Sequence, residues 1–234
     1  MVSYIIKFFL IFISIMTSAC SDINKGEGNR DQSLTFFDRP EKDRLPYFRG
    51  KDLEAFWLKP DQKLTEARKV DPFKFTNQLN AEFGLENLKN KITAVSFFFA
   101  KCNGICPNIT RNLIFVQSSY KDNPNVQLVS FSVTPDLDTP EALRKFADEK
   151  GIISGKWNLL TGPRNRIHSM ARTVFQADTN TINKNPNDFV HSEQIFLIDK
   201  NLYFRGVYNG NKGDSVQTMI SDIKILENET SVSN

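Results

Sequence analysis

The chain has 234 residues, of which 40% are hydrophobic and 24% charged, and this fits one globular domain with flanking segments. Its 20 phenylalanines supply enough large apolar side chains for a packed core, which excludes a globally disordered chain. Lys and Arg outnumber Asp and Glu by only 30 to 27, and a formal charge of +3 is too small to indicate a nucleic-acid partner. A disulfide scaffold is excluded because the chain has 3 cysteines, which are Cys20, Cys102 and Cys106.

The first twenty residues have the pattern of an export signal. Residues 4–16 form an apolar run interrupted by Lys7. This run is shorter than the roughly 18 to 20 apolar residues of a membrane span, so we favour a secretory signal over a permanent anchor. The small residues before Cys20 resemble the lipobox of bacterial lipoproteins, in which that cysteine is lipidated. We expect residues 1–20 to be a lipoprotein signal, with an ordinary cleavage site or an uncleaved anchor as the alternatives.

The next segment is polar and has no aromatic residue over 21–33, which is typical of a flexible linker. We expect residues 21–44 to tether a folded domain at 45–226 to a membrane of the bacterial cell envelope, facing the periplasm. Residues 227–234 are similarly polar and are predicted to be a disordered tail.

A strand, a loop and a helix are predicted around the second and third cysteines. Residues 92–99 form a continuous run of β-branched and aromatic residues, typical of a strand buried on both faces. The run ends in AKCNGICP, and Pro107 is suited to the first turn of a helix. Apolar residues then recur at helical spacing until Asn123-Pro124.

The remaining elements alternate between strand and helix, with Asp138 and Glu141 three apart as a capping box before one of the helices. A hairpin is also predicted upstream, over residues 73–88. Strands are predicted at 126–133, 157–160, 194–199 and 202–208. Helices are predicted at 139–150 and 214–226, and a further helix includes residues 167–174. This order indicates an α/β domain with a mixed sheet.

The spacing of Cys102 and Cys106 favours thiol or metal chemistry. Residues at i and i+4 of a helix have Cβ atoms roughly 5 to 6 Å apart, so both sulfurs can reach one metal ion or each other. The start of a helix lowers the pKa of a thiol there, which makes the thiolate accessible near neutral pH. The alternative is that both cysteines are small buried hydrophobic residues.

The two histidines have different expected roles. His191 lies just before the strand that begins near Gln194, where the corresponding loop of a thioredoxin-like fold faces the cysteines. Two thiolates and one imidazole suit Cu(I), whereas zinc would need a fourth ligand. His168 is predicted to be a surface histidine or one whose hydrogen bonds are satisfied within a helix.

Five segments, in this order and spacing, carry a family resemblance: KCNGICP, SFSVTPDLDTPEAL, WNLLTG, HSEQIFLID and FRGVYNG. Over about residues 45–226 the chain resembles the Sco/SenC family of copper-binding, thioredoxin-like assembly factors for cytochrome c oxidase. The resemblance implies a thioredoxin-like α/β fold with a central mixed sheet flanked by helices and an extra N-terminal hairpin. It also implies copper ligation by Cys102, Cys106 and His191.

The sequence departs from the family pattern after the second predicted strand. Thr134 stands where the family often has the first aspartate of Asp-Pro-Glu-x-Asp-Thr, whereas Asp138 matches the second. We expect Asp138 to cap the next helix, and support of the metal site is a second interpretation. The three residues between the cysteines also differ from the common Pro-Asp-Val type.

The resemblance implies a membrane-tethered copper chaperone that holds one copper ion, Cu(I) or Cu(II), and delivers it to the copper-site subunit of cytochrome c oxidase. A copper donor and a thiol reductant would be its other partners. The alternative is a thiol-disulfide oxidoreductase that keeps the cysteines of the oxidase copper site reduced, with Cys102 and Cys106 as the redox pair. Only the chaperone needs His191. A peroxidase of the peroxiredoxin type would need Thr or Ser where Phe99 or Asn103 stands, and a non-catalytic binding module is the remaining option.

Overall fold

The computed structural model describes residues 43–58, 64–101, 106–177 and 192–229, and for Cys106 only the backbone. Cys20, Cys102 and His191 lie outside the described residues. The strands are β1 Tyr47–Arg49, β2 Glu54–Phe56, β3 Lys74–Asn77, β4 Glu82–Gly84, β5 Ile92–Phe98, β6 Val126–Ser132, β7 Trp157–Thr161, β8 Gln194–Ile198 and β9 Phe204–Asn209. The helices are η1 Leu64–Glu66, η2 Leu85–Asn87, α2 Cys106–Ser119, α3 Pro140–Lys150, α4 Arg164–Thr173 and α5 Gly213–Asn228.

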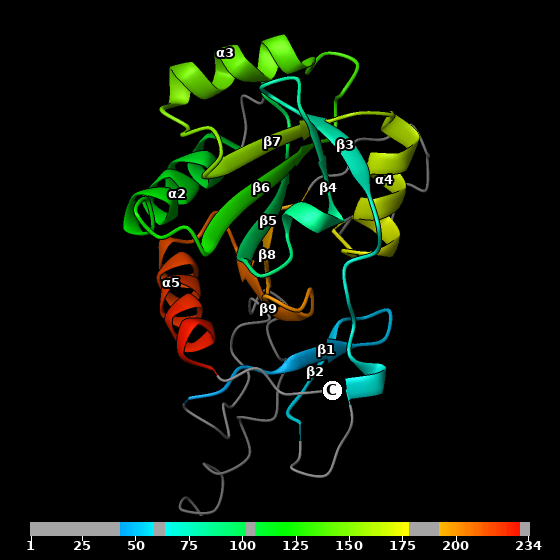
Figure 1. Ribbon diagram of the computed structural model, residues 1–234, viewed down its shortest axis with the longest axis vertical. Coiled ribbons are helices and arrows are strands. Elements are labelled where there is room, and N and C mark those ends of the chain that lie inside the picture. The colour runs from blue at the N-terminus through cyan, green and yellow to red at the C-terminus, as the bar shows by residue number, and fades with distance from the viewer. Residues whose placement is uncertain (1–42, 59–63, 102–105, 178–191, 230–234) are drawn as a thin grey trace, which may run out of the picture. The chain divides into compact units, whose positions relative to one another are not determined.

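A mixed sheet of seven strands forms the centre of the domain, in the order β4-β3-β7-β6-β5-β8-β9 (Figure 1). The three strands β5, β6 and β7 are parallel, and β8 joins β5 antiparallel with Ser96 opposite Ile195. Every residue of β5 and of β6 is buried, as the continuous run of β-branched and aromatic residues predicted for β5. The predicted α/β domain with a mixed sheet is confirmed.

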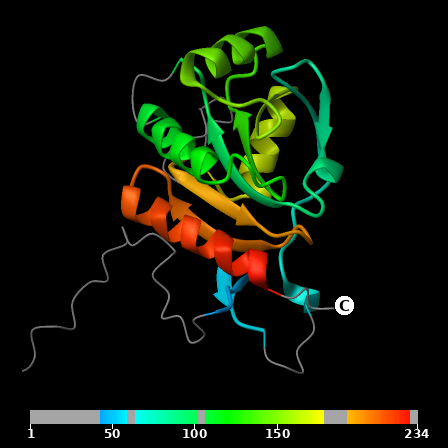
Figure 2. The same ribbon diagram turned by 60° about the vertical axis from the view of Figure 1, so that its left-hand side comes forward.

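Helices cover both faces of this sheet, as Figure 2 shows from the side. One apolar cluster joins α2, α3 and α5 to one face, and a second joins α4 to the other face. The face under α4 is rich in aromatic rings, with centroids 5.1 to 6.2 Å apart among Phe73, Phe75, Phe97, Phe131, Phe175, Phe196 and Phe204. Many of the phenylalanines thus form the core on the α4 side.

The extra hairpin predicted upstream is present as β3 and β4, which pair antiparallel. The pair of strands predicted around the turn at Lys200-Asn201 is also present, as β8 and β9. The last helix differs from its prediction, because α5 continues through Glu227 to Asn228. The tail predicted to begin at residue 227 is therefore helical at its start.

A second hairpin, β1 and β2, was not predicted. The chain that enters β1 lies against Arg205 of β9, whose side chain is buried. The Arg205 guanidinium donates to the carbonyl oxygens of Leu45 and Pro46 at 2.9 and 3.0 Å, and it pairs with Asp199 at 3.1 Å and Glu229 at 2.7 Å. We call Arg205, Asp199 and Glu229 the arginine cluster. It ties the start of the domain and the end of α5 to the sheet.

The two outer strands of the sheet, β9 and β4, differ in how their free edges are protected from pairing with another strand. Beside β9, Lys69 forms an antiparallel bridge with Tyr203, and the amide of Phe204 donates to the Arg68 carbonyl at 3.1 Å. At the other side β4 has only 3 residues, and its Glu82 pairs with Lys74 of β3. The β9 edge is therefore partly covered by residues 68–69, and the β4 edge is short and charged.

Candidate metal centre

The candidate ligands are close in sequence to elements that begin or end on one side of the sheet. Cys106 is the first residue of α2, so this helix begins at a predicted ligand, and Cys102 comes four residues after the last residue of β5. His191 comes three residues before β8. Because β8 runs antiparallel to its neighbour β5, the amino end of β8 lies beside the carboxyl end of β5. Carboxyl ends of parallel strands are where open α/β sheets place their sites.

Asp138 lies at this edge, and its side chain is 2% exposed. Its Oδ2 accepts hydrogen bonds from the Ser132 hydroxyl at 2.6 Å and the Thr134 hydroxyl at 2.9 Å. It also accepts one from the amide of Ala100 at 3.2 Å. Ala100 is two residues before Cys102, so the Asp138 carboxylate restrains the chain between the end of β5 and Cys102.

The prediction that Asp138 caps the next helix is wrong. The N-cap of α3 is Thr139, whose hydroxyl accepts from the amide of Ala142 at 3.2 Å. Thr139 has extended backbone, and threonine is one of the residues whose side-chain oxygen caps helices. Asp138 instead turns inward, because three donors converge there on its carboxylate.

Thr134 has a structural role that the sequence alone did not reveal. Where the family pattern has an aspartate, this hydroxyl donates to Asp138. A second carboxylate at that distance would place two negative charges in a buried site and would raise the pKa of one of them. The threonine therefore lets Asp138 accept three hydrogen bonds without a competing charge.

A second set of contacts at this edge also went unnoticed in the sequence. The Asn112 side chain of α2 donates to the carbonyl oxygen of Gly210 at 2.7 Å. The Gly210 amide donates to the carbonyl of Glu193, immediately before β8, at 2.6 Å. Asn112 and Gly210 are 98 residues apart, and no local pattern could have connected them.

His168 is a buried helix histidine whose Nε2 lies 2.8 Å from the carbonyl oxygen of Val133. Of the two predicted alternatives, a helix histidine with a hydrogen-bond partner is confirmed and a surface histidine is wrong. Among the residues that the structure describes, no three His, Cys, Asp or Glu side chains gather as a metal-binding group. The predicted ligand set, which includes Cys102 and His191, extends beyond those residues.

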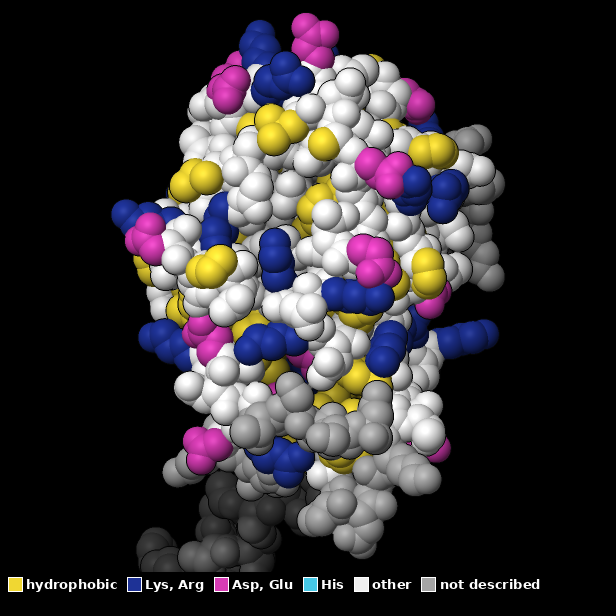
Figure 3. All heavy atoms as spheres, viewed as in Figure 1, with side chains coloured by type: hydrophobic (Ala, Val, Ile, Leu, Met, Phe, Trp, Pro, Cys, Tyr) yellow, Lys and Arg dark blue, Asp and Glu magenta, His cyan; other side chains and the backbone are white. Residues whose placement is uncertain are grey.

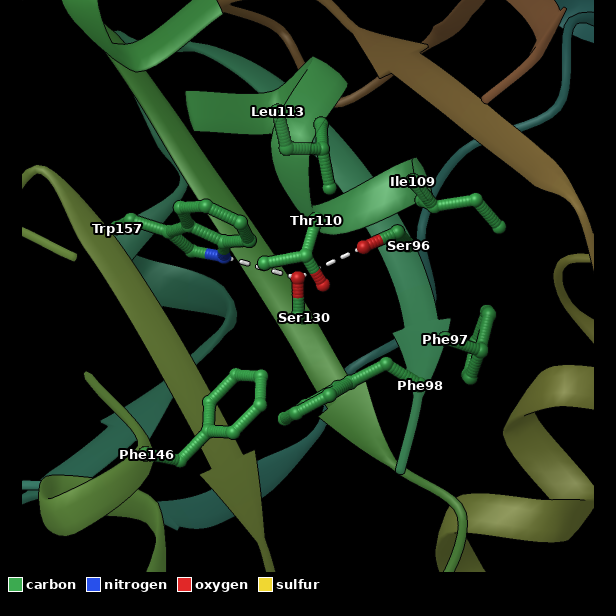
Figure 4. Close-up of a pocket in the computed structure, with 9 residues that line it drawn as sticks. All are labelled: Ser96, Phe97, Phe98, Ile109, Thr110, Leu113, Ser130, Phe146 and Trp157. Atoms are coloured by element: carbon green, nitrogen blue, oxygen red, sulfur yellow. Dashed lines mark hydrogen bonds between the residues drawn. The ribbon is translucent and has the colours of Figure 1, made fainter. Parts of the chain in front are cut away.

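A small cavity lies beneath the first turns of α2 (Figure 4). Its volume is about 10 Å³, which is room for about one water molecule and far too little for an organic substrate. Ser130 bridges the cavity wall, because its hydroxyl lies 2.7 Å from that of Ser96 and accepts from the Trp157 indole at 2.9 Å. The polar atoms around this cavity are therefore used in packing the sheet.

The surface in view carries charges of both signs. Lys and Arg side chains are interspersed with Asp and Glu side chains in Figure 3. Arg164 at the start of α4, for example, pairs with Asp136 at 3.2 Å. Over the described ranges, no helix combines the length and the apolar character that crossing a membrane requires.

Comparison with known proteins supports one family. The SCO1/SenC family model matches residues 61–227. The SCO1 protein homolog of Bacillus subtilis (strain 168) is 32% identical over 160 residues, which cover 66% of this chain and 81% of that protein.

Solved structures agree with this match. A SCO1/SenC family lipoprotein from Bacillus anthracis str. Ames is 33% identical with a TM-score of 0.60, over 68% of this chain and 95% of that one. The structure of BsSco, described as a member of the Sco family of cytochrome c oxidase assembly proteins with a disulfide switch, is 31% identical with a TM-score of 0.60, over 70% and 95%. Copper-bound ScoI of Arabidopsis thaliana is 24% identical with a TM-score of 0.55, over 68% and 99%, and shares the fold. The predicted thioredoxin-like fold is thereby confirmed.

Proposed function

This chain belongs to the SCO1/SenC family, and from that premise we propose that it supports assembly of the copper centre of cytochrome c oxidase. In this proposal the protein is a copper chaperone. Cys102, Cys106 and His191 bind one copper ion, and the copper-site subunit of the oxidase receives it.

One observation supports the proposed copper ligands more than any other. The helix that begins at Cys106 follows β5, the chain that contains His191 enters β8, and β5 and β8 are paired neighbours. Thiolate sulfur is the ligand type that Cu(I) prefers, and a neutral imidazole completes a three-ligand site. Two cysteines and one histidine on adjacent strand ends are therefore a suitable donor set for copper.

We further propose that Asp138 supports this site without touching the metal. Its hydrogen bond from the Ala100 amide restrains the chain two residues before Cys102, and Ser132 and Thr134 hold the carboxylate in place. Partners of this kind fix the orientation of the ligands themselves.

The location follows from the amino-terminal segment. We propose that Cys20 carries a lipid that anchors residues 21–44 and the domain to a membrane of the bacterial cell envelope, facing the periplasm. The description of a 33% identical relative as a lipoprotein supports this location.

A second function is favoured by the disulfide switch described for BsSco. In a thiol-disulfide reaction, one thiolate of the pair attacks a disulfide of the oxidase subunit and forms a mixed disulfide. The other cysteine then attacks this bond, so that the target gains two thiols and Cys102 and Cys106 become a disulfide. A thiol reductant would restore the pair, and the same protein could then load copper.

The direct test is copper binding by the exported domain under reducing conditions. We expect one Cu(I) per wild-type chain, loss of binding when both cysteines are replaced by serine, and clearly weaker binding by His191→Ala. His168→Gln is the matched control, because it changes the other histidine, which is satisfied by Val133. Unchanged tight binding by His191→Ala would contradict the three-ligand site.

Deletion of the protein in its host separates the two functions. If delivery is the main role, added copper restores oxidase activity. If thiol maintenance is the main role, only an external reductant restores it. The two rescues are measured on the same deletion strain.

A further inference from the structure

A polar bridge connects α2, which begins at Cys106, with the chain that enters β8 shortly after His191. Asn112 lies on α2 six residues after Cys106, and its side-chain amide donates to the carbonyl oxygen of Gly210 at 2.7 Å. The amide of Gly210 donates in turn to the carbonyl oxygen of Glu193 at 2.6 Å. Gly210 therefore binds α2 through its carbonyl and the entrance of β8 through its amide.

Gly210 approaches the start of β8 closely. A Cβ atom at this position would lie 2.9 Å from Ile195 Cδ1 and 3.1 Å from the Glu193 carbonyl oxygen. Such contacts are tighter than ordinary packing, so a side chain here would force Ile195 or the Glu193 backbone to shift, and glycine suits the close approach.

The loop that contains Gly210 is itself held on both sides. The Asn209 side chain donates to the Glu193 carboxylate at 3.0 Å and accepts from the amide of Asn211 at 2.9 Å. The amide of Asn209 donates to the Ser215 hydroxyl on α5 at 2.9 Å. These hydrogen bonds fix the position of the loop around Gly210, so a side chain that binds Gly210 is held in a defined place.

We propose that Asn112 is a positioning residue for the copper site. Through Gly210 it sets the spacing between the helix that begins at Cys106 and the chain that carries His191 two residues before Glu193. The proposal rests on the proposed function, because it assigns a role toward the same ligands. The apolar side of α2 packs without directional bonds, whereas the Asn112 hydrogen bond specifies one distance and one orientation.

The same helix offers a matched control. Gln117 also lies on α2, is 2% exposed, and donates from its side-chain amide to a glycine carbonyl, that of Gly151, at 3.0 Å. It also accepts from the amide of Ile153 at 2.8 Å. Gln117 thus anchors the far half of α2 with an equivalent bond, and its loss should affect stability rather than the copper site.

The experiment compares Asn112→Ala with Gln117→Ala in the full mature chain. We measure Cu(I) affinity by ligand competition and the visible and electron paramagnetic resonance spectra of the Cu(II) form, together with urea unfolding. For Asn112→Ala we expect copper binding weakened about tenfold and a changed Cu(II) spectrum, as for other residues that orient metal ligands. For Gln117→Ala we expect lower stability with copper affinity and spectrum unchanged.

A copper-free measurement keeps this proposal separate from the proposed function. Asn112→Ala should shift the nuclear magnetic resonance signals of the His191 imidazole in the reduced, metal-free protein, and Gln117→Ala should not. Absence of copper binding by the wild type would contradict the proposed function, while the imidazole signals still decide the role of Asn112. Equal effects of the two variants, or no effect of Asn112→Ala, would overturn the proposal. If Asn112→Ala does not fold, Asn112→Asp decides in its place, because it has the same size but no donor for Gly210.

Discussion

The two ends of β5 each hold a buried carboxylate, and the partners of the two carboxylates differ. At the amino end, Asp199 pairs with the guanidinium of Arg205, which also binds Glu229. At the carboxyl end, Asp138 accepts from two hydroxyls and the Ala100 amide, and none of these donors is charged. The carboxylate at one end of the strand forms an ion pair, and the carboxylate at the other end accepts hydrogen bonds from uncharged donors.

The pKa directions reflect the crowding of charge at the amino end. Burial raises the pKa of Asp199, although Arg205 and two backbone amides act in the opposite sense. Burial lowers the pKa of Arg205, but the hydrogen bond and charge of Glu229 outweigh it and leave that pKa raised. Arg205 is shared by the buried carboxylate of Asp199 and the partly buried carboxylate of Glu229, so removal of the cation leaves two charges unpaired.

The comparison teaches a division of tasks along one strand. The arginine cluster joins distant parts of the chain, residues 45–46, β9 and Glu229, and so contributes to the stability of the whole domain. The Asp138 contacts involve only the ends of β5 and β6 and the start of the loops that follow them, so they restrain the chain near the site. We expect damage at the first end to appear in unfolding, and damage at the second end to appear mainly in the site.

The largest effect should come from Arg205→Ala. This change leaves the buried Asp199 and the partly buried Glu229 without their cation, and breaking a buried ion pair such as Arg205–Asp199 costs about 3 to 5 kcal/mol. Urea unfolding measures the loss. At low denaturant the fraction that remains folded should bind copper as the wild type does, and a specific loss of copper affinity would contradict the division of tasks.

Asp138→Ala should have a smaller effect on stability and a larger one on the site. Three donors lose their acceptor, which costs about 1 to 3 kcal/mol for a buried group. Because the Ala100 amide is released two residues before Cys102, copper affinity should fall about tenfold. Competition with a Cu(I) chelator measures this.

Thr139→Ala serves as the control for Asp138, since it removes the cap of α3 but leaves the Asp138 contacts in place. It should lower stability by about 1 kcal/mol without changing copper affinity. If Thr139→Ala and Asp138→Ala weaken copper binding equally, the role assigned to Asp138 is incorrect.

The smallest effect concerns Tyr120, just beyond the end of α2 that lies away from Cys106. Its hydroxyl donates to the Ile220 carbonyl at 2.8 Å, and burial, with a contribution from Glu227, raises its pKa to about 12. Between its ordinary pKa of 10.0 and that value the folded protein keeps a proton that the unfolded chain has lost, so stability falls as the pH rises through this range.

Tyr120→Phe tests this pH dependence. At neutral pH it should cost about 1 kcal/mol for the lost hydrogen bond, and it should remove the Tyr120 part of the alkaline loss. Urea unfolding at a series of alkaline pH values measures both. An identical pH profile in the wild type and the variant would show that this phenol does not stay protonated in the fold, and copper affinity should be unchanged.

The sequence predicted the elements whose signals are local. The apolar runs of β5 and β6, the helical spacing after Pro107 and the turn at Lys200-Asn201 all appear in the structure where they were expected. The family resemblance added the thioredoxin-like fold, and the donor residues that it implies stay a prediction. The hairpin of β1 and β2 was missed because its strands have only three residues each and show no clear alternation.

Long-range polar contacts could not be predicted in the same way. Asp138 was assigned to the helix beside it, whereas its acceptor oxygen binds Ala100, 38 residues earlier. Arg205 reaches Leu45 over 160 residues. Nothing in the neighbourhood of these residues along the chain encodes such partners, because each bond depends on how separate strands come together in the sheet.

The covered edges of the sheet have a consequence for crowding. An open edge strand offers unpaired amides and carbonyls to another chain, and long open edges promote aggregation. Here the bridge between Lys69 and Tyr203 occupies part of the β9 side, and β4 is short and carries the Lys74–Glu82 pair. These features limit the unpaired backbone that a neighbouring copy could reach, so copies anchored to one membrane are less prone to join their sheets into fibrils.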